Sequence, residues 1–382
     1  MFSRSIRAIP VIGLLSSFSI PTFCDKPLVN EKSQTLIKDY KDTVILSCSA
    51  SEELTDQICT HLKTKKGKIE IVQFSDGEVY PTIAESIRGK HVFVVQSCSA
   101  PVNVNIMELL LTVTAARRSG SESVTAVIPY FGYRLHRRGL PVSTKYHSKF
   151  LWSAAGDFAK MLLSVGVDHV ISVDLQRPGQ GHEACFFDNE LSVETISAND
   201  EFISYFKQSN CLEGPVVVVS PNAECIKKAQ KFQKKLHSVL GLETSYAAFL
   251  HDQQHAGNQR LVSYDPAIHS ELLGDVRGCD VIIVDDVVDT GVSLSTLCRR
   301  LRKEGAKRVY VCASHGVFSH NSMNLIDLSP VEKVIVTDSI PLPSHVSNKI
   351  VQVPVAKLIA KVIEAEVYGS KEKEEDDIFE AE

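Results

Sequence analysis

The residue types that can do chemistry gather in one short stretch of this chain, residues 281–295, which reads VIIVDDVVDTGVSLS. Apolar residues that fit a buried strand come first, two adjacent carboxylates follow, and a turn with hydroxyls then leads toward a helix. Open α/β sheets bind ligands at the carboxyl ends of their strands, and backbone N–H groups at a helix N-terminus favour a phosphate. The carboxylates suit ribose hydroxyls or a hydrated Mg²⁺ ion. The candidate residues are Asp285, Asp286, Asp289, Thr290, Gly291 and Ser293.

The same residues also have a purely structural interpretation. Asp and Ser are good helix N-caps, so a strand that ends in an acidic cap would explain a lone Asp285-Asp286 pair. In the complete string the aspartates are followed by Thr290, Gly291 and Ser293. That combination favours a phosphate and sugar site over a cap.

The elements that must position this site alternate between strand and helix. Strand-like runs at residues 43–49, 68–74, 91–97, 123–131 and 169–175 are interrupted by helix-like stretches at 51–62 and 105–120. The second half repeats this alternation, with strand-like runs at 215–220, 279–286, 308–314 and 333–339. The alternation predicts the α/β class, with two tandem domains that are each a mainly parallel sheet flanked by helices. We expect an N-terminal targeting or linker segment over residues 1–40, domains over 41–190 and 191–368, and an acidic disordered tail over 369–382.

The distribution of charge excludes some classes of partner. The 382 residues carry a formal net charge of −5, and residues 371–382 alone contain seven acids against two lysines. The rest of the chain is therefore balanced and has no global basic field for nucleic acid. No apolar run reaches the roughly 20 residues that a membrane span needs. We expect small ligands at local sites, with no nucleic acid and no membrane as partners.

Cysteine use and the N-terminal composition bear on the compartment. The ten cysteines form no C-x-x-C pair, and Cys59, Cys279, Cys298 and Cys312 lie in apolar contexts that predict buried free thiols. This pattern indicates a reducing compartment. Residues 1–24 hold no acid, two arginines and five serines, which is typical of a mitochondrial transit segment. A secretory signal over residues 8–15, which conflicts with free thiols, and an uncleaved N-terminus are the alternatives.

The 281–293 string resembles the loop that binds phosphoribosyl pyrophosphate (PRPP) in type I phosphoribosyltransferases and in PRPP synthetases. Residues 74–97, FSDGEVYPTIAESIRGKHVFVVQS, are similar to an N-terminal signature of PRPP synthetases that salvage phosphoribosyltransferases lack. Agreement continues through 101–133, 164–175, 186–188, 274–278, 313–319 and 336–341, so the resemblance covers about residues 43–365 in order. The chain is identified as a homologue of the PRPP synthetases, or ribose-phosphate pyrophosphokinases. The resemblance implies two tandem type I phosphoribosyltransferase-like domains.

This resemblance implies a reaction for nucleotide biosynthesis. The β,γ-diphosphate of ATP moves to the C1 hydroxyl of ribose 5-phosphate, with Mg²⁺, and gives PRPP and AMP. The resemblance assigns Phe74, Asp76 and Glu78 to the adenine side of the ATP site and the 285–293 residues to the ribose-phosphate side. In a family active site the adenine-side residues come from a neighbouring subunit. We therefore expect a homo-oligomer based on dimers and as large as a hexamer, or a hetero-oligomer with homologues, in the cytoplasm by family default or in the mitochondrion by its N-terminal composition.

The segment after residue 133 departs from the family pattern on the ATP side. The family continues IPYFGY with Ala-Arg-Gln-Asp-Arg, and here only Arg138 aligns directly. We expect Arg134, His136 and Arg137 to supply charge to the ATP phosphates from shifted positions, with plain surface charge as the alternative.

The metal side departs as well. The Asp-Leu-His of the family, whose Asp and His hold the metal, is Asp174-Leu175-Gln176 here. Gln is a poor substitute for an imidazole ligand. We expect Asp174 as a metal ligand, with His182 on the following insert as the candidate that replaces the lost imidazole.

The largest departures concern catalysis. Where the family has Ser-Pro-Asp-x-Gly-Gly, residues 220–225 read SPNAEC, so the ribose-binding carboxylate is replaced by Asn222 and a glycine by Glu224. Residues 249–260 align with a family loop that brings Lys and Arg onto the transferring phosphate, and they place Asp252 and a glutamine there. An acid repels the diphosphate at that position. His182 and Arg260 remain as candidate catalytic groups.

Three functions follow from these observations. The first is an active PRPP synthetase with a remodelled loop. The second is a PRPP-synthetase-like subunit without its own turnover, which assembles with active homologues and regulates them; the lost cations and carboxylate favour it. The third is a salvage phosphoribosyltransferase, which would not need the ATP signature at residues 74–138.

Overall fold

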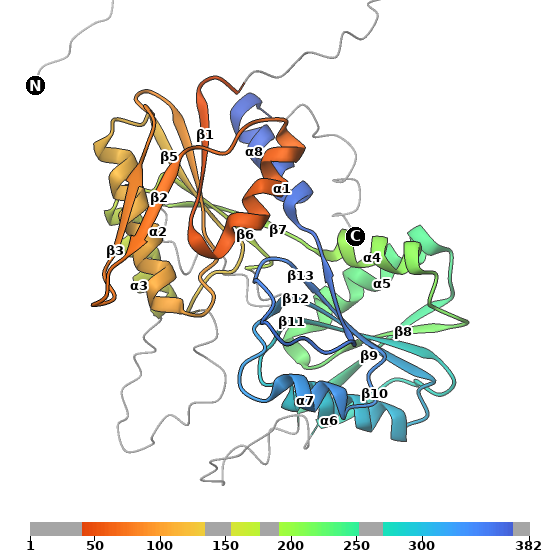
Figure 1. Cartoon of the computed structure of the whole chain (residues 1–382). Coiled ribbons are helices and arrows are strands. Elements are labelled where there is room, and N and C mark those ends of the chain that lie inside the picture. The colour runs from red at the N-terminus through yellow and green to blue at the C-terminus, as the bar shows by residue number, and fades with distance from the viewer. Residues whose placement is uncertain (1–39, 134–153, 176–190, 252–269, 370–382) are drawn as a thin grey trace, which may run out of the picture. The chain divides into compact units, whose positions relative to one another are not determined.

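The computed structural model describes residues 40–133, 154–175, 191–251 and 270–369 (Figure 1). The expected N-terminal segment up to residue 39 and the acidic tail from residue 370 lie outside the described residues, as do the 176–190 and 252–269 stretches. The candidate residues outside them are Arg134, His136, Arg137, Arg138, His182, Asp252 and Arg260.

Five parallel strands of the described residues form the first sheet, in the order β1-β4-β5-β6-β7. The central strands are buried after their first residue, because helices cover both faces of a parallel sheet. The strands are β1 (Thr43–Ser47), β4 (His91–Val95), β5 (Ser123–Ile128), β6 (His169–Val173) and β7 (Ser192–Ile196). The helices between them are α1 (Glu52–Leu62), α2 (Val102–Arg118) and α3 (Ala154–Ser164).

The strand expected over residues 68–74 exists but is not part of this parallel sheet. It is β2 (Ile69–Gln73), which pairs antiparallel with β3 (Val79–Ile83) in a hairpin of its own. The hairpin packs against α2 through β3.

Seven strands of the described residues form the second sheet, in the order β10-β9-β8-β11-β12-β13-β14. All neighbours are parallel except the edge pair β10 and β9. The strands are β8 (Val216–Ser220), β9 (Thr244–His251), β10 (Ser270–Leu273), β11 (Asp280–Val288), β12 (Arg308–Gly316), β13 (Lys333–Thr337) and β14 (Ile350–Val353). The helices are α4 (Asn199–Ser209), α5 (Ile226–Leu240), α6 (Val292–Lys303), α7 (Ser322–Asp327) and α8 (Ala356–Tyr368). The predicted α/β class is confirmed.

Helix α8 follows the second sheet in sequence but packs against α1 of the first (Figure 1). The rings of Tyr40 and Tyr368 meet edge to face with their centroids 5.3 Å apart. Ile363 of α8 and Ile58 of α1 belong to one hydrophobic cluster, which also includes residues of the second sheet such as Val218. A single core therefore joins elements from both sheets.

The change from one sheet to the other lies later in the chain than the expected boundary at residues 190 and 191. Strand β7 follows that boundary, yet it pairs with β6 at the edge of the first sheet. The short, half-buried β7 carries no signal in its own composition that assigns it to one sheet.

The described cysteines all have free thiols, and Cys59, Cys298 and Cys312 are buried as expected. Cys279 is only half-buried, because it precedes β11 instead of lying inside it. Burial raises the pKa of the Cys98 and Cys298 thiols to about 12, so both stay protonated. None of the helices in the described ranges has the length and apolar character to span a bilayer.

Candidate functional site

The turn between β11 and α6 has the geometry of an anion site. Gly291 caps α6 with a left-handed backbone (φ 77°), a conformation that residues with a Cβ adopt only with strain. The N–H of Val292 points to the hydroxyl of Thr290 over 3.5 Å, and the carboxylate of Asp289 accepts a hydrogen bond from Ser319. Thr290 and Ser293 are exposed at the start of the helix. The strand, turn and helix start predicted within residues 281–295 are all present.

Asp285 and Asp286 end the buried part of β11 and have different surroundings. Asp285 accepts a hydrogen bond from the backbone N–H of Asp286 at 2.8 Å and one from the thiol of Cys225 at 3.9 Å. Asp286 is only 3% exposed and accepts from the ammonium group of Lys228 at 2.7 Å. Asp285 is thus the more accessible of the two carboxylates for a sugar hydroxyl.

Lys228 of α5 lies at the centre of a buried polar cluster. Its ammonium group donates to Asp286, to the hydroxyl of Ser314 at 3.1 Å and to the backbone carbonyl of Asp285 at 3.3 Å. Burial opposes the charge of Lys228, but the carboxylates of Asp174 and Asp286 raise its pKa above the usual value. Lys228 is therefore a permanent cation beside the candidate ribose site.

Asp174, the expected metal ligand, belongs to this cluster and connects the two sheets. It follows β6 of the first sheet with a left-handed backbone (φ 42°), a strained conformation for a residue with a side chain. Its Oδ2 accepts from the hydroxyl of Ser314 at 2.5 Å and from the N–H of Ala198 at 3.2 Å, and lies 3.7 Å from the Lys228 ammonium. The structure thus brings Asp174 and Asp286 together around one lysine.

His315 supports the same junction and was not singled out from the sequence. Its Nε2 lies 3.0 Å from the backbone carbonyl of Val173 and its Nδ1 lies 2.8 Å from the hydroxyl of Ser339. Its ring packs edge to face on Tyr130, with the centroids 5.0 Å apart. His315 is fully buried, so it positions the end of β6 and does not reach ligands itself.

The fit of a directly bound Mg²⁺ ion can be judged from these contacts. One oxygen of Asp174 and one of Asp286 already lie within 4 Å of the Lys228 ammonium, at 3.7 Å and 2.7 Å, and a divalent ion between them would lie against that ammonium. Among the described residues no three His, Cys, Asp or Glu side chains are grouped to hold a metal. The pair Asp174 and Asp286 therefore does not fit a metal, and His182 lies outside the described residues.

The adenine-side candidates lie together on the turn between β2 and β3. The carboxylate of Asp76 accepts from the N–H of Glu78 at 3.1 Å, and the backbone N–H of Phe74 donates to the carbonyl of Glu78. The Phe74 ring is 50% exposed and lies 6.4 Å from the ring of Tyr80, which is 60% exposed. This turn belongs to a different element from the β11–α6 turn, and it presents two exposed aromatic rings that are tilted by 50° to each other.

Asn222 stands where the family carries a ribose-binding carboxylate. Its side-chain oxygen accepts from the N–H of Cys225 at 3.0 Å and caps the short helix η3 (Ala223–Cys225), while its own carbonyl accepts from Ser220. The amide thus has a local structural role. The side chain of Glu224, the other expected misfit, lies outside what the structure describes.

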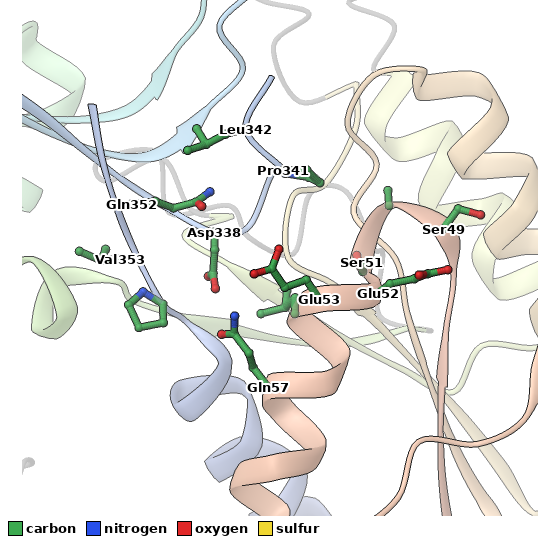
Figure 2. A pocket seen from close by; sticks show the side chains of 13 residues that line it. Ser49, Ser51, Glu52, Glu53, Gln57, Asp338, Pro341, Leu342, Gln352 and Val353 are labelled. Atoms are coloured by element: carbon green, nitrogen blue, oxygen red, sulfur yellow. The ribbon is translucent and has the colours of Figure 1, made fainter. Parts of the chain in front are cut away.

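A separate cavity of about 510 Å³ lies between the start of α1 and the ends of β13 and β14. In Figure 2 the side chains of Asp338 and Glu53 point into the same space, beside Gln57 and Gln352. Burial raises the pKa of Asp338 to about 6, and Glu53 adds to this rise. The hydrogen bond that Asp338 accepts from the N–H of Val355, at the start of α8, opposes it.

Two mainly parallel sheets, with an acidic strand end and a glycine turn that opens a helix, define a protein of the phosphoribosyl-binding class. Residues 43–156 match the N-terminal domain of ribose phosphate pyrophosphokinase, and residues 215–371 match the phosphoribosyl synthetase-associated domain. The chain belongs to the ribose-phosphate pyrophosphokinase family.

Curated relatives agree over nearly their whole length. The chain is 33% identical to ribose-phosphate pyrophosphokinase of Oceanobacillus iheyensis, over 86% of this chain and 96% of that protein. It is 35% identical to the Aquifex aeolicus enzyme of that name, over 84% and 94% of the two chains. It is 30% identical to the chloroplastic ribose-phosphate pyrophosphokinase 1 of rice, over 94% and 84%.

A solved structure shows the same fold. The phosphoribosylpyrophosphate synthetase from Mycobacterium smegmatis superimposes with a TM-score of 0.72 at 26% identity, covering 86% of this chain and all of that one. The predicted fold and family are both confirmed.

Proposed function

We propose that this chain synthesises PRPP by transferring the β,γ-diphosphate of ATP to the C1 hydroxyl of ribose 5-phosphate. The observation that supports this most is the acidic end of β11 with Asp285, followed by the turn at Gly291 and by Ser293 in the first turn of α6. Family membership supports the same activity, and the ATP-side hairpin argues against a salvage phosphoribosyltransferase.

In this proposal the 5-phosphate of ribose binds the exposed N–H groups and hydroxyls of the 290–293 turn. The carboxylate of Asp285 accepts hydrogen bonds from ribose hydroxyls. The C1 oxygen then attacks the β-phosphorus of ATP, which enters as its Mg²⁺ complex. The new bond joins C1–O to Pβ, the bond from Pβ to the α-phosphate oxygen breaks, AMP leaves, and the hydroxyl proton passes to solvent.

The proposal also includes the residues that bind each substrate and the oligomeric state of the protein. We assign ATP to Phe74, Asp76 and Glu78 together with Arg134, His136, Arg137 and Arg138, and ribose 5-phosphate to the 285–293 turn. The exposed Phe74 and Tyr80 surface supports a neighbouring subunit at the hairpin, in a dimer-based homo-oligomer or in a hetero-oligomer with catalytic homologues. Mass measurement by light scattering on the purified chain, alone and after co-expression with a homologue, separates these assemblies.

A regulatory subunit without turnover of its own is the second candidate function. The observation that favours it is Asn222, whose side chain caps η3 instead of offering a carboxylate to the ribose. Both candidate functions require ribose 5-phosphate to bind. Only the active synthetase transfers the diphosphate and releases AMP.

The decisive experiment is AMP formation by the purified chain, free of homologues, with MgATP and with or without ribose 5-phosphate. An active synthetase releases AMP only when ribose 5-phosphate is present, and the Ser293→Ala variant shows a slower release. Ribose 5-phosphate binding without AMP release, followed by stimulation of a co-purified homologue, would instead assign the regulatory role.

The compartment is a separate part of the proposal. The default for this family is the cytoplasm, and the acid-free N-terminal residues 1–24 support a mitochondrial alternative. Fluorescent fusions of the full chain and of a chain that lacks residues 1–40 distinguish the two, because a transit segment sends the full chain to the mitochondrion and leaves the shortened chain in the cytoplasm.

A further inference from the structure

The buried cluster around Lys228 holds two carboxylates from different parts of the chain. Asp286 comes from β11 and Asp174 from the end of β6, and their side chains are only 4% and 11% exposed. Two carboxylates that are removed from water and face one point need a counter-charge. In this chain the counter-charge is supplied from within the protein.

Lys228 supplies this counter-charge, and all three of its N–H donors are used in hydrogen bonds. An ammonium group has three N–H donors, and those of Lys228 are matched by three acceptors: Asp286 at 2.7 Å, Ser314 at 3.1 Å and the carbonyl of Asp285 at 3.3 Å. The side chain is 6% exposed.

Ser314 completes the cluster by linking the lysine to Asp174. Its hydroxyl accepts from Lys228 and donates to Asp174, which also accepts from the backbone N–H of Ala198. A metal ion bound to Asp174 at this side would have to break the Ser314 hydrogen bond and lie within a few ångströms of a fixed positive charge.

We propose that the Lys228 ammonium is a built-in cation that takes the place of a divalent metal between Asp174 and Asp286, so that ribose 5-phosphate binds this chain without a metal ion on these carboxylates. This inference rests on the proposed function, which names ribose 5-phosphate as the ligand. It goes beyond that function because it identifies the cation between the two carboxylates. Mg²⁺ that enters as part of MgATP is a separate matter, because it arrives with the triphosphate.

The first test is binding of Mn²⁺ alone to the full-length protein, followed by electron paramagnetic resonance. We expect the wild type to bind no Mn²⁺ at this cluster, so the Asp174→Asn variant gives the same titration. The Lys228→Met variant leaves two buried carboxylates without their cation, and we expect it to gain one Mn²⁺ site. Lys227→Met is the matched control, because Lys227 is the exposed neighbour on the same helix and its loss adds no site.

The second test is calorimetric titration of ribose 5-phosphate in excess Mg²⁺ and in chelator. For the wild type we expect dissociation constants that agree within about threefold in the two media. For Lys228→Met we expect binding in chelator to weaken by about tenfold or more, with recovery when Mn²⁺ is added.

The two tests separate the inference from the proposed function. A wild-type Mn²⁺ site that disappears in Asp174→Asn would overturn the inference and leave the function standing; so would ribose 5-phosphate binding that needs Mg²⁺. If ribose 5-phosphate binds in neither medium, the proposed function fails, and the Mn²⁺ titration still decides the inference. The wild-type and Asp174→Asn comparison also decides it if Lys228→Met does not fold.

Discussion

Thr125 in β5 donates a hydrogen bond of 2.6 Å to the carboxylate of Glu366 in α8, across 241 positions of sequence. The same carboxylate lies 3.4 Å from Nδ1 of His169 in β6. Glu366 therefore connects α8 to two neighbouring strands of the first sheet.

The Glu366→Gln variant tests this connection through its pH dependence. Glu366 raises the pKa of His169, chiefly through their hydrogen bond, so the folded protein binds a proton that the unfolded chain holds less tightly. The extra stability is present below the unfolded pKa of about 6.5 and is lost as pH rises through the folded value. We expect urea denaturation to show that Glu366→Gln is less stable than the wild type by about 1 kcal/mol in acid. The difference in the free energy of unfolding should be smaller in mildly alkaline solution. A stability difference between wild type and Glu366→Gln that grows with pH would contradict this prediction. A stability difference that persists when His169 is also replaced by Gln would contradict it as well.

The Asp338→Asn variant is expected to stabilise the protein at neutral pH. Because the pKa of Asp338 is raised to about 6 in the folded protein, the charged form of Asp338 destabilises the fold. This destabilisation is complete above pH 6 and disappears as pH falls toward the pKa of Asp338 in the unfolded chain. Asparagine keeps an acceptor for the Val355 N–H and removes the charge. We expect a gain of about 1–2 kcal/mol in the free energy of unfolding at neutral pH, with no gain near pH 4. Glu52→Gln, which changes an exposed acid on the same cavity, is the control and should show no such trend.

The Gly291→Ala variant probes the turn that would hold the 5-phosphate. A Cβ at this position meets ordinary contact distances, the nearest being 3.5 Å from Ser322, so the cost is the left-handed backbone. We expect a stability loss of about 1 kcal/mol and a weakening of ribose 5-phosphate binding by about tenfold, measured by calorimetry. Gly278→Ala has a similar backbone (φ 71°) with open space around it and lies outside the site, so it should lose stability alone. Equal binding in both variants would show that the turn does not contact the ligand.

The Asn222→Asp variant restores the carboxylate that the family carries. Asp and Asn are similar as helix caps, so stability should change by less than about 0.5 kcal/mol. We expect ribose 5-phosphate to bind several-fold more tightly, by calorimetry, because the new carboxylate accepts hydrogen bonds from ribose hydroxyls. Asn210→Asp, at the exposed end of α4, is the control for added charge. Unchanged affinity would mean that Asn222 lies away from the sugar.

The sequence was sufficient to predict the α/β class and the β11–α6 turn, because both are encoded locally. The run from Val281 to Ser293 contains the strand, the acids and the helix start in contiguous residues. The family resemblance assigned Phe74, Asp76 and Glu78 to one side of the ATP site, and these residues are also close in sequence. They share one hairpin turn.

The Lys228 cluster could not be predicted in this way, because its members come from segments far apart. Lys228 and Asp286 are 58 residues apart, and Ser314 and Asp174 are 140 apart. A lysine within the basic helix α5 looks like surface charge, and only the fold shows that Lys228 faces inward while Lys227 faces solvent. The pairing of β7 with β6 is likewise not encoded in the residues of β7 alone, since strand pairing is decided by the partner strand.

The packing of α8 on α1 has a consequence for synthesis on the ribosome. Ile359 and Ile363 of α8 belong to the cluster that contains Ile45 and Ile58, so the part of α1 that packs on α8 stays uncovered until α8 has been made. Roughly 290 residues separate the end of α1 from the start of α8, which corresponds to about 15–60 s of elongation. During that time the nascent first half displays the apolar surface that α8 covers in the folded chain. Chaperone demand during translation should therefore be high for this chain, and a stop codon before residue 356 should yield an aggregating product, not a smaller stable domain.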